Sequence, residues 1–276
     1  MSHAVTYTAV LPVRAATVDW LTGLLAAERA ARGTRHDRRA LSCREQAILA
    51  LCWFYDATRI RQLVRDHRIG TSTCYRYLHE AIDVLAAAAP GLDEALTAAR
   101  AAGHTHLGLD GTVIFTDRVR RPGPNPGVHL WWSGKHHRHG ANIQVLTTPD
   151  GWPLHTSRVR PGREKDVTCA RRQHLPDLLA QRWNDPTHVV LADLGYEGEA
   201  AIFVVPDKNH RGRGLSVDQR TRNLLHRATP ALCERGNSLL KTTFAALRQV
   251  SLCPWRIGDI TAAALALLHH EHDRAA

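Results

Sequence analysis

Residues 104–116, which read HTHLGLDGTVIFT, decide the fold class of the later part of the chain. Their apolar side chains recur with a period of two, as in a β-strand that buries one face. These side chains are Leu107, Leu109, Val113 and Phe115. Asp110 falls inside this strand on the opposite parity. A carboxylate within a strand is costly to bury unless it is paired or bound to a cation, so Asp110 is a candidate functional residue.

The segments that follow alternate between strand and helix. Residues 187–193, THVVLAD, form a nearly continuous apolar run, which predicts a central buried strand that ends on Asp193. The other expected elements are a hairpin of residues 141–148 and 152–160, a helix from Asp166 with a kink at Pro176, a strand at 202–207 and a last helix from near Pro230 to Val250. This order predicts a mixed α/β domain over residues 104–276.

The first 103 residues have the pattern of helices. A Ser42–Glu45 capping box and the apolar spacing after it predict an amphipathic helix. Two helices joined by a tight turn are expected over residues 58–89, which is typical of a helix-turn-helix. The second helix would present these residues to DNA: Thr71, Ser72, Thr73, Tyr75 and Arg76. A plain helical hairpin inside a bundle is the alternative.

Composition and charge exclude several classes of protein. The 276 residues carry a formal net charge of +10, and the excess lies mostly in residues 118–172 and 205–256, which favours a polyanionic partner. No apolar run is long enough for a transmembrane helix, and the N-terminus lacks a signal-peptide pattern, so we expect a cytoplasmic protein without a membrane partner. The six cysteines include no C-x-x-C pair and are expected to be reduced core residues. The sequence has no G-x-x-x-x-G-K-[ST] loop, so no nucleotide cofactor is expected.

Three acids stand out by their position: Asp110 in a strand, Asp193 at a strand end and Glu234 on the last long helix. Converging carboxylates would hold hard divalent cations, above all Mg²⁺, and two such ions could support an in-line phosphoryl transfer. Position alone leaves other interpretations open, because the chain has 26 acidic residues and a strand-end aspartate often caps the next turn. Asp166 is expected as a helix N-cap, with an auxiliary acid as the alternative.

Basic residues accompany these acids. Lys241 and Arg248 follow Glu234 at intervals of seven, about two helical turns, so the three would share one helix face. In SGKHHRHG, residues 133–140, Lys135 and Arg138 are candidates for contacts with a DNA backbone. A carboxylate that holds metal beside cations that bind phosphates would suit a DNA-processing surface. A solvated stripe without function is the alternative.

The segments LGLDGT (107–112), LADLGYEG (191–198) and ERGNSLLK (234–241) resemble, in this order, the three acidic motifs of DDE transposases in the IS5-like group of bacterial insertion sequences. SGKHHRHGANIQ (133–144) and the hairpin after it resemble the segment between the first two motifs. The resemblance covers about residues 5–270. It implies a ribonuclease-H-like catalytic domain, similar to that of retroviral integrases, in which helices flank a mixed sheet. It also implies an N-terminal all-α helix-turn-helix region.

The resemblance also implies an activity and a site. Asp110, Asp193 and Glu234 would be the catalytic triad that binds two Mg²⁺ ions, for which Mn²⁺ would substitute. Lys241 matches the family's DNA-contacting lysine, and Tyr196 would support Asp193 or a nucleotide near the cut. The implied protein is a transposase that nicks double-stranded DNA at terminal inverted repeats and joins the freed 3′-hydroxyl to target DNA. Because two ends are processed together, a homodimer on DNA is expected.

Two alternatives would use the same surfaces. One is a catalytically silent helix-turn-helix regulator derived from a transposase. The other is a metal-dependent endonuclease that cuts without strand transfer. The presence of all three acids and of Lys241 favours an enzyme over the regulator.

Overall fold

The computed structural model describes residues 10–35, 38–209, 214–226 and 228–276. The chain divides into two compact units, residues 1–84 and 85–276. Within the described ranges, no helix is both long and apolar enough to cross a lipid bilayer. All six cysteines are described and none forms a disulfide; Cys74, Cys169 and Cys233 are buried, and the other three are half-buried or exposed.

The first unit is built from helices. They are α1 (Ala15–Ala31), α2 (Cys43–Asp56), α3 (Ile60–Asp66) and α4 (Thr71–Ala87), the last of which continues into the second unit. The predicted capping box begins α2, since Ser42 and Glu45 exchange backbone-to-side-chain hydrogen bonds. The buried Gln46 amide donates to the Tyr77 carbonyl at 3.0 Å and to Glu80 at 2.9 Å, which ties α2 to α4.

A tight turn joins α3 to α4. Arg68 in this turn adopts a left-handed backbone (φ +52°), a conformation that glycine commonly supplies. Leu63 on α3 and Cys74 and Leu78 on α4 are buried. The expected pair of helices is therefore present, whereas its role as a DNA-binding helix-turn-helix stays a prediction.

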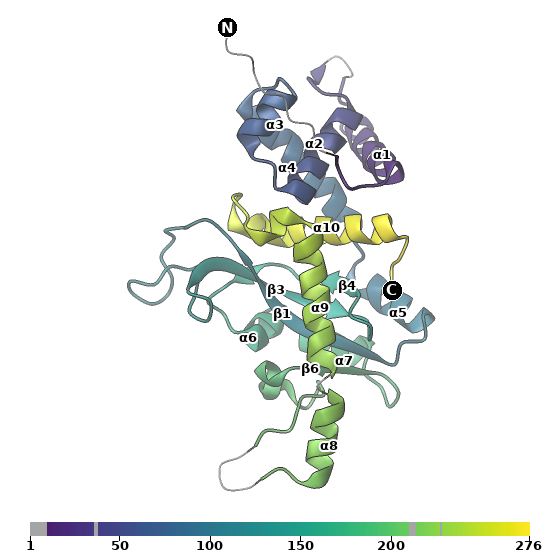
Figure 1. Ribbon diagram of the computed structural model, residues 1–276, viewed down its shortest axis with the longest axis vertical. Coiled ribbons are helices and arrows are strands. Elements are labelled where there is room, and N and C mark those ends of the chain that lie inside the picture. The colour runs from purple at the N-terminus through teal and green to yellow at the C-terminus, as the bar shows by residue number, and fades with distance from the viewer. Residues whose placement is uncertain (1–9, 36–37, 210–213, 227) are drawn as a thin grey trace. The chain divides into compact units, whose positions relative to one another are not determined.

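A mixed sheet forms the centre of the second unit (Figure 1). Its strands are β1 (His106–Phe115), β2 (Trp132–Ser133), β3 (Arg138–Thr147), β4 (Pro153–Thr156), β5 (Arg160–Pro161) and β6 (Val189–Ala192). β1 and β3 run antiparallel as the long central pair, and β6 runs parallel to the other edge of β1. The short strands β2, β5 and β4 pair with the outer edge of β3. The predicted hairpin is β3–β4, and the predicted buried strand is β6.

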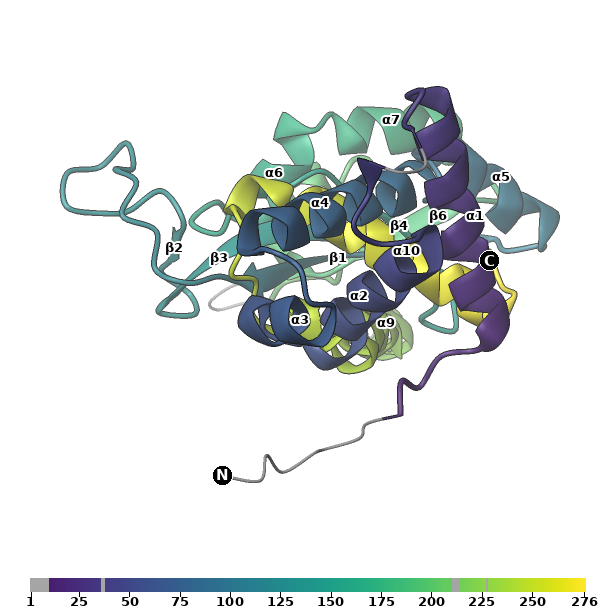
Figure 2. The same cartoon turned by 90° about the horizontal axis from the view of Figure 1, so that it is seen from above.

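Helices cover both faces of this sheet. The remaining elements are α5 (Leu92–Ala101), α6 (Asp166–Arg172), α7 (Leu175–Arg182), η2 (Leu194–Glu199), α8 (Val217–His226), α9 (Ala228–Thr243), η3 (Ala245–Arg248), η4 (Pro254–Arg256) and α10 (Ile257–His272), where η marks a 3₁₀ helix. Seen from above, α6 and α7 lie on one side of β1 and β3, and α9 lies on the other (Figure 2). The predicted mixed α/β architecture is confirmed.

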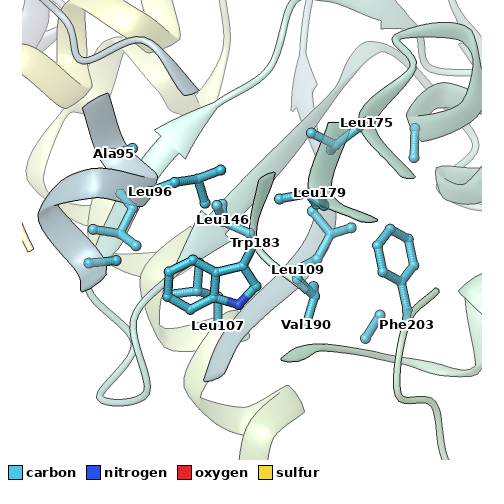
Figure 3. Packing of buried hydrophobic residues seen from close by; sticks show 14 of the residues in the cluster. Ala95, Leu96, Leu107, Leu109, Leu146, Leu175, Leu179, Trp183, Val190 and Phe203 are labelled. Atoms are coloured by element: carbon cyan, nitrogen blue, oxygen red, sulfur yellow. The ribbon is translucent and has the colours of Figure 1, made fainter. Parts of the chain in front are cut away.

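The main apolar core fills the α7 side of the sheet. Figure 3 shows Trp183 packed among Leu107 and Leu109 of β1 and Val190 of β6. A fully buried leucine contributes about 1.5–3 kcal/mol to folding, so this cluster fixes the first half of β1 firmly. Helix α5 contributes to the same cluster and packs with the sheet, although the sequence groups it with residues 1–103.

Two elements before α8 differ from the sequence prediction. Residues 202–207 do not form a strand, and only Val204 makes a single bridge, to Leu191 of β6. The helix expected from Asp166 is two helices, α6 and α7. The break occurs because His174 has a left-handed backbone (φ +55°), which places Pro176 in the first turn of α7, where proline is tolerated.

The last predicted helix is also shorter than expected. α9 ends at Thr243 instead of Val250, because Phe244 leaves the helical conformation (φ −109°, ψ 98°). A 3₁₀ turn, η3, follows it. Residues beyond Thr243 therefore do not continue the side-chain rows of α9.

Candidate active site

β1 has strand partners on both edges along only part of its length. Its parallel pairing with β6 covers His106–Leu109 and stops where β6 stops. Beyond it, the described residues add to this edge only one bridge, between Thr116 and Val250. We call this edge of Asp110–Phe115 the open edge; at its end the Val250 amide donates to the Phe115 carbonyl at 2.8 Å. The open edge is available to side chains from helices and loops.

Asp110 and Asp193 lie side by side where the pairing of β1 with β6 ends. Leu109 of β1 is opposite Ala192 of β6 in the parallel register, so Asp110 is the next residue of β1 and Asp193 is the first residue after β6. Adjacent strands lie about 4.8 Å apart, which brings both residues to one end of the pair. The structure therefore brings together the first two predicted catalytic acids.

Asp110 is held by a helix and lies among like charges. Its Oδ2 accepts a hydrogen bond from Asn237 Nδ2 of α9 at 2.7 Å. Burial raises the pKa of the Asp110 carboxyl to about 6, and the charges of Asp193 and Asp166 act in the same direction. The hydrogen bonds from Gly111 and Asn237 oppose this shift only in part. A nearby cation would stabilise the ionised form.

Asp193 follows β6 directly and begins η2. Its side chain accepts a hydrogen bond from the Gly195 amide at 2.9 Å, so it also caps the next turn. Tyr196 is fully buried and its hydroxyl donates to Gln144 Oε1 of β3. Burial raises the pKa of Tyr196 well above its usual value, so the phenol stays protonated. Tyr196 therefore anchors the loop after Asp193 to the sheet, which fits support of that aspartate better than contact with a nucleotide.

α9 places polar side chains along the open edge. Asn237 and Lys241 follow Glu234 after about one and two helical turns, and Glu234 itself is exposed. Lys241 Nζ donates to Thr112 Oγ1 at 2.6 Å and to the Val113 carbonyl at 3.1 Å. Burial lowers the pKa of Lys241. Lys241 thus bonds the open edge itself, and its contact with DNA stays a prediction.

Arg248 does not share this helix face. It lies in η3, after α9 has ended, and its guanidinium donates to the carbonyls of Lys241 at 3.1 Å and Thr242 at 3.2 Å. The interval of seven residues fails because the helix stops at Thr243. Arg248 instead stabilises the carboxyl end of α9. The expectation of a shared face is wrong, whereas a contact between Arg248 and DNA stays a prediction.

Asp166 begins α6 but is not its N-cap. The N-cap residue is Lys165, and in the described structure no side chain caps this helix end. Asp166 Oδ1 accepts a hydrogen bond from Asn142 Nδ2 of β3 at 2.6 Å. Its carboxylate lies against Gly111, where a Cβ would collide with it. The expected N-cap is therefore wrong, and the auxiliary acid remains.

A cavity of about 360 Å³ adjoins Asp166. Its lining combines Asp166 and Asn142 with the cations Lys135, Arg163 and Lys165. Guanidinium and ammonium groups bind phosphate oxygens strongly, so this lining suits a phosphate beside a carboxylate. Lys135, a predicted contact for DNA, is exposed in this wall.

Arg138 lies at the far end of the open edge. Its guanidinium stacks 3.9 Å from the ring centroid of Phe115 and donates to Gln249 Oε1 at 3.1 Å. The side chain is exposed, so it can also reach a DNA phosphate.

In the first unit, the first turns of α4 carry the other residues predicted to bind DNA. Thr71, Ser72, Tyr75 and Arg76 are exposed, and Thr73 is half-buried. Hydroxyls and a guanidinium on one helix end can donate to phosphates and base edges. Their contact with DNA stays a prediction.

The oxygen atoms near the open edge suit a hard divalent cation. Among the described residues, no three His, Cys, Asp or Glu side chains gather closely enough to enclose an ion. Asp110 and Asp193 nevertheless act on one another, and Asn237 Oδ1 is buried without a hydrogen-bond partner in the described part of the chain. Mg²⁺ often binds through one or two carboxylates and completes its shell with water and phosphate oxygens. The donor set therefore fits an open Mg²⁺ site and not a closed cage.

Sequence reasoning missed three amide side chains of this region: Asn142, Gln144 and Asn237. Asn237 lies one turn after Glu234, so helical periodicity was a usable signal. Asn142 and Gln144 alternate along β3 and are buried, and polar side chains on one face of an apolar strand need hydrogen-bond partners. Neither signal names the partner, because the partners come from distant segments.

The later part of the chain matches a known protein family. Residues 109–269, more than half of the chain, match the model of the DDE superfamily endonuclease family. The matched range contains Asp110, Asp193 and Glu234. No curated protein sequence matches the chain. A mixed sheet flanked by helices is compatible with a ribonuclease-H-like domain of this family.

Proposed function

The chain belongs to the DDE superfamily endonucleases, and from this premise we propose that it is a DNA transposase of the IS5-like group. It cuts double-stranded DNA at the terminal inverted repeats of an insertion sequence and joins the freed 3′-hydroxyl to target DNA. Asp110, Asp193 and Glu234 are its catalytic acids.

The observation that carries this proposal is the arrangement around Asp110. A strand carboxylate lies at the end of a parallel strand pair, next to Asp193, and accepts a hydrogen bond from Asn237 of the helix that also carries Glu234. Keeping like charges together in a half-buried place is costly for packing alone. A bound cation would offset the repulsion between the carboxylates, so the arrangement suits an enzyme that holds a cation there.

Asp110 and Asp193, together with Glu234 from α9, would hold divalent cations, Mg²⁺ in the first place and Mn²⁺ as a substitute. When bound, such cations supply Lewis-acid stabilisation of the charge that develops on a phosphodiester. Asn237 keeps the Asp110 carboxylate in one orientation. Lys241 brings a positive charge to the same edge, where it offsets the acids and the DNA phosphates.

Other parts of the chain hold the DNA. The exposed cations Lys135 and Arg138, with Arg248 near the end of α9, bind backbone phosphates. The first turns of α4 act as the recognition helix of a helix-turn-helix and read the terminal repeats. A homodimer on DNA, within the cytoplasm, processes both ends of the element.

The test uses labelled DNA that carries the repeats flanking the gene, with a supercoiled plasmid as target. Wild type and Asp193→Ala are compared in Mg²⁺, in Mn²⁺ and in EDTA. Asp177→Asn is the matched control, because Asp177 is an aspartate on α7 whose side chain is 80% exposed. We expect a metal-dependent nick at a repeat end that Asp193→Ala loses and Asp177→Asn keeps.

The products separate the three candidate functions. Labelled strands joined to the plasmid support a transposase. Nicks without joined products indicate a metal-dependent endonuclease without strand transfer. If wild type and both variants bind the repeats tightly but none of them cuts DNA, the protein is the catalytically silent regulator, and the proposal is overturned.

A further inference from the structure

The cavity beside Asp166 lies on the face of β1 that is opposite to the Asp110 side chain. Gly111 and Val113 of β1 line this cavity, and successive residues of a strand point to opposite faces. On the other face, Asp110 accepts its hydrogen bond from Asn237 of α9. The cavity is therefore a site of its own, separate from the place where α9 holds the catalytic acid.

Three cations in the wall of the cavity have no acidic partner. Lys135, Arg163 and Lys165 make no ion pair with any other described residue, and Nη1 of Arg163 is buried without a hydrogen-bond partner in the described part of the chain. The neighbouring Glu164 does not offset them, because two other arginines pair with it at 2.8 Å and 3.1 Å. The wall keeps an excess of positive charge, which suits a phosphate.

Hydrogen bonds fix the one unpaired carboxylate of this wall. Asn142 Nδ2 donates to Asp166 Oδ1 at 2.6 Å, and Gln144 Nε2 donates to Asn142 Oδ1 at 2.8 Å. The Tyr196 hydroxyl donates in turn to Gln144 Oε1. Oδ2 of Asp166 makes no hydrogen bond within the described ranges, so it can accept one from a ligand. A carboxylate in this position suits an amino group of a nucleobase.

The size of the cavity suits a nucleotide better than a phosphate alone. Its volume of about 360 Å³ lies within the range of small-molecule sites, roughly 300–1,000 Å³, and a phosphate would leave most of it empty. The cations and the carboxylate match the two ends of a nucleotide, which are an anionic phosphate and a base that donates. A base paired within a duplex cannot enter a pocket, so the nucleotide must be unpaired.

The cavity adjoins the open edge at Val113 and His136. Val113 lines the cavity, while its carbonyl accepts a hydrogen bond from Lys241 Nζ at 3.1 Å. Burial lowers the pKa of His136, another lining residue, and the charges of Lys135 and Lys241 add to this shift. Lys241 therefore lies close to the cavity. A DNA strand that passes Lys241 at the open edge can place its next nucleotide there.

We propose that the cavity binds one unpaired nucleotide of the DNA strand, with the phosphate on the three cations and an amino group of the base on Asp166. The inference rests on the proposed function, because that function supplies the DNA strand. Adenine, cytosine and guanine carry such an amino group and thymine does not, so the cavity disfavours thymine. Asn142 acts through Asp166 and is a positioning residue.

The test measures nucleotide binding without DNA cutting. dAMP, dTMP and inorganic phosphate are titrated into the full chain in EDTA, with the heat of binding as the readout. Arg163→Gln and Lys165→Gln each remove one cation of the wall, and Lys165 is exposed, so its replacement leaves the core intact. Asp166→Asn removes the carboxylate. Arg220→Gln is the matched control, because Arg220 is an exposed cation on α8 outside the cavity.

We expect wild type to bind dAMP on the order of tenfold more tightly than dTMP, and Asp166→Asn to lose this preference. Arg163→Gln and Lys165→Gln should weaken dAMP binding on the order of tenfold, whereas Arg220→Gln should bind like wild type. The inference is overturned if inorganic phosphate binds as tightly as dAMP, or if the variants of the cavity bind dAMP as wild type does.

A single-stranded oligodeoxyadenylate tests whether the nucleotide belongs to a DNA strand. It should displace dAMP from wild type at a lower concentration than free dAMP requires, because neighbouring phosphates add contacts. If it does not displace dAMP, the cavity serves a free nucleotide and the inference is overturned. A wild type that binds dAMP as expected but cuts no repeat DNA in Mg²⁺ overturns the proposed function instead. A wild type that cuts repeat DNA but binds no dAMP overturns the inference alone.

Discussion

The two halves of β1 are held in place by different interactions. From His106 to Leu109 the strand pairs with β6, and at Gly108 and Leu109 also with β3; Leu107 and Leu109 are at most 1% exposed. From Asp110 to Phe115 its only strand partner among the described residues is β3, and α9 contacts its other edge through Asn237 and Lys241. The first half is fixed mainly by apolar burial and its pairing with β6, whereas the second is fixed by its ladder with β3 and, on the other edge, by hydrogen bonds from α9.

This difference explains where the chemistry can occur. In a strand that is paired on both edges, the backbone groups are already used in hydrogen bonds to the neighbouring strands. Where β6 ends, the same strand gains an accessible edge while its first half keeps the backbone fixed. Asp110 is the first residue beyond the boundary, so it combines a rigid backbone with a half-buried carboxylate beside the open edge.

The largest expected effect on DNA cleavage comes from a substitution in the second half of β1, Asp110–Phe115, which we call the open half. Asp110→Asn removes the negative charge but keeps the shape, and we expect DNA cleavage to fall on the order of 10³-fold or more, because a metal-binding carboxylate is lost. Single-turnover cleavage of labelled repeat DNA measures this, with Asp177→Asn as control. Cleavage within about tenfold of wild type, a change of only about 1.4 kcal/mol in the barrier, would remove Asp110 from the catalytic site.

A substitution in the first half of β1, which we call the packed half, should lower stability instead of removing a catalytic group. Leu109→Ala removes a side chain that is 1% exposed, so we expect the free energy of unfolding to fall by about 2–5 kcal/mol. Urea denaturation measures this loss, and cleavage is assayed well below the unfolding temperature. Leu224→Ala on α8 is the matched control, because Leu224 is 65% exposed and should cost little. A stable Leu109→Ala protein would show that the core does not fix this half of β1.

The pKa of Asp110 gives a pH-dependent test of stability in EDTA. Its folded value of about 6 lies above the ordinary 3.8, so folding favours the protonated acid. Asp110 therefore costs nothing below pH 3.8, and its cost grows as the pH rises from 3.8 through 6. Above that range the cost is about 3 kcal/mol, as an order of magnitude.

Asp110→Asn removes this cost. The variant should be more stable than wild type at pH 7–8 by about 2–3 kcal/mol, and the two should converge near pH 4. Thermal and urea unfolding at several pH values measure the difference. Added Mg²⁺ should then stabilise wild type but not the variant, since only wild type binds it well. A variant less stable than wild type at pH 8 would contradict the raised pKa.

The sequence predicts the packed half of β1 better than the open half. Leu107 and Leu109 follow the expected period of two, and the apolar run at 187–193 correctly gives the buried strand β6. In the second half Ile114 is buried, and Val113 and Phe115, which the alternation predicted to be buried, are only half-buried. Val113 is half-buried because it lines the cavity beside Asp166.

The candidate site divides in the same way. Asp110 and Asp193 could be found by position in strands, since their neighbours carry a strong apolar signal. The intervals of seven residues from Glu234 to Arg248 gave a wrong prediction of one shared helix face. Periodicity assumes a continuous helix, and this helix ends before Phe244. The contact of Asp166 with Gly111 could not be predicted, since it depends on the tertiary approach of α6 to β1.

The smallest expected effect on cleavage comes from the hydrogen bond that Asn237 of α9 donates to Asp110. Asn237→Ala removes the amide that donates to Asp110, so we expect cleavage to fall about 10–100-fold, as for residues that orient a metal-binding group. Because this hydrogen bond lowers the pKa of Asp110, its loss should raise that pKa further. The deficit should therefore be larger at pH 6–7 than at pH 8–9, where Asp110 is ionised in both proteins.

The pH dependence distinguishes positioning from packing. If Asn237 only packed α9 onto β1, Asn237→Ala would lower the unfolding temperature and reduce cleavage equally at every pH. Ser238→Ala is the control on the same helix, since Ser238 is the next residue along the chain and is exposed, whereas Asn237 is buried. A deficit that shrinks as the pH rises, in a variant folded at the assay temperature, means that a single amide from α9 keeps Asp110 in its working state. The open half of β1 is then held by directed hydrogen bonds, whose loss changes the chemistry before it changes the fold.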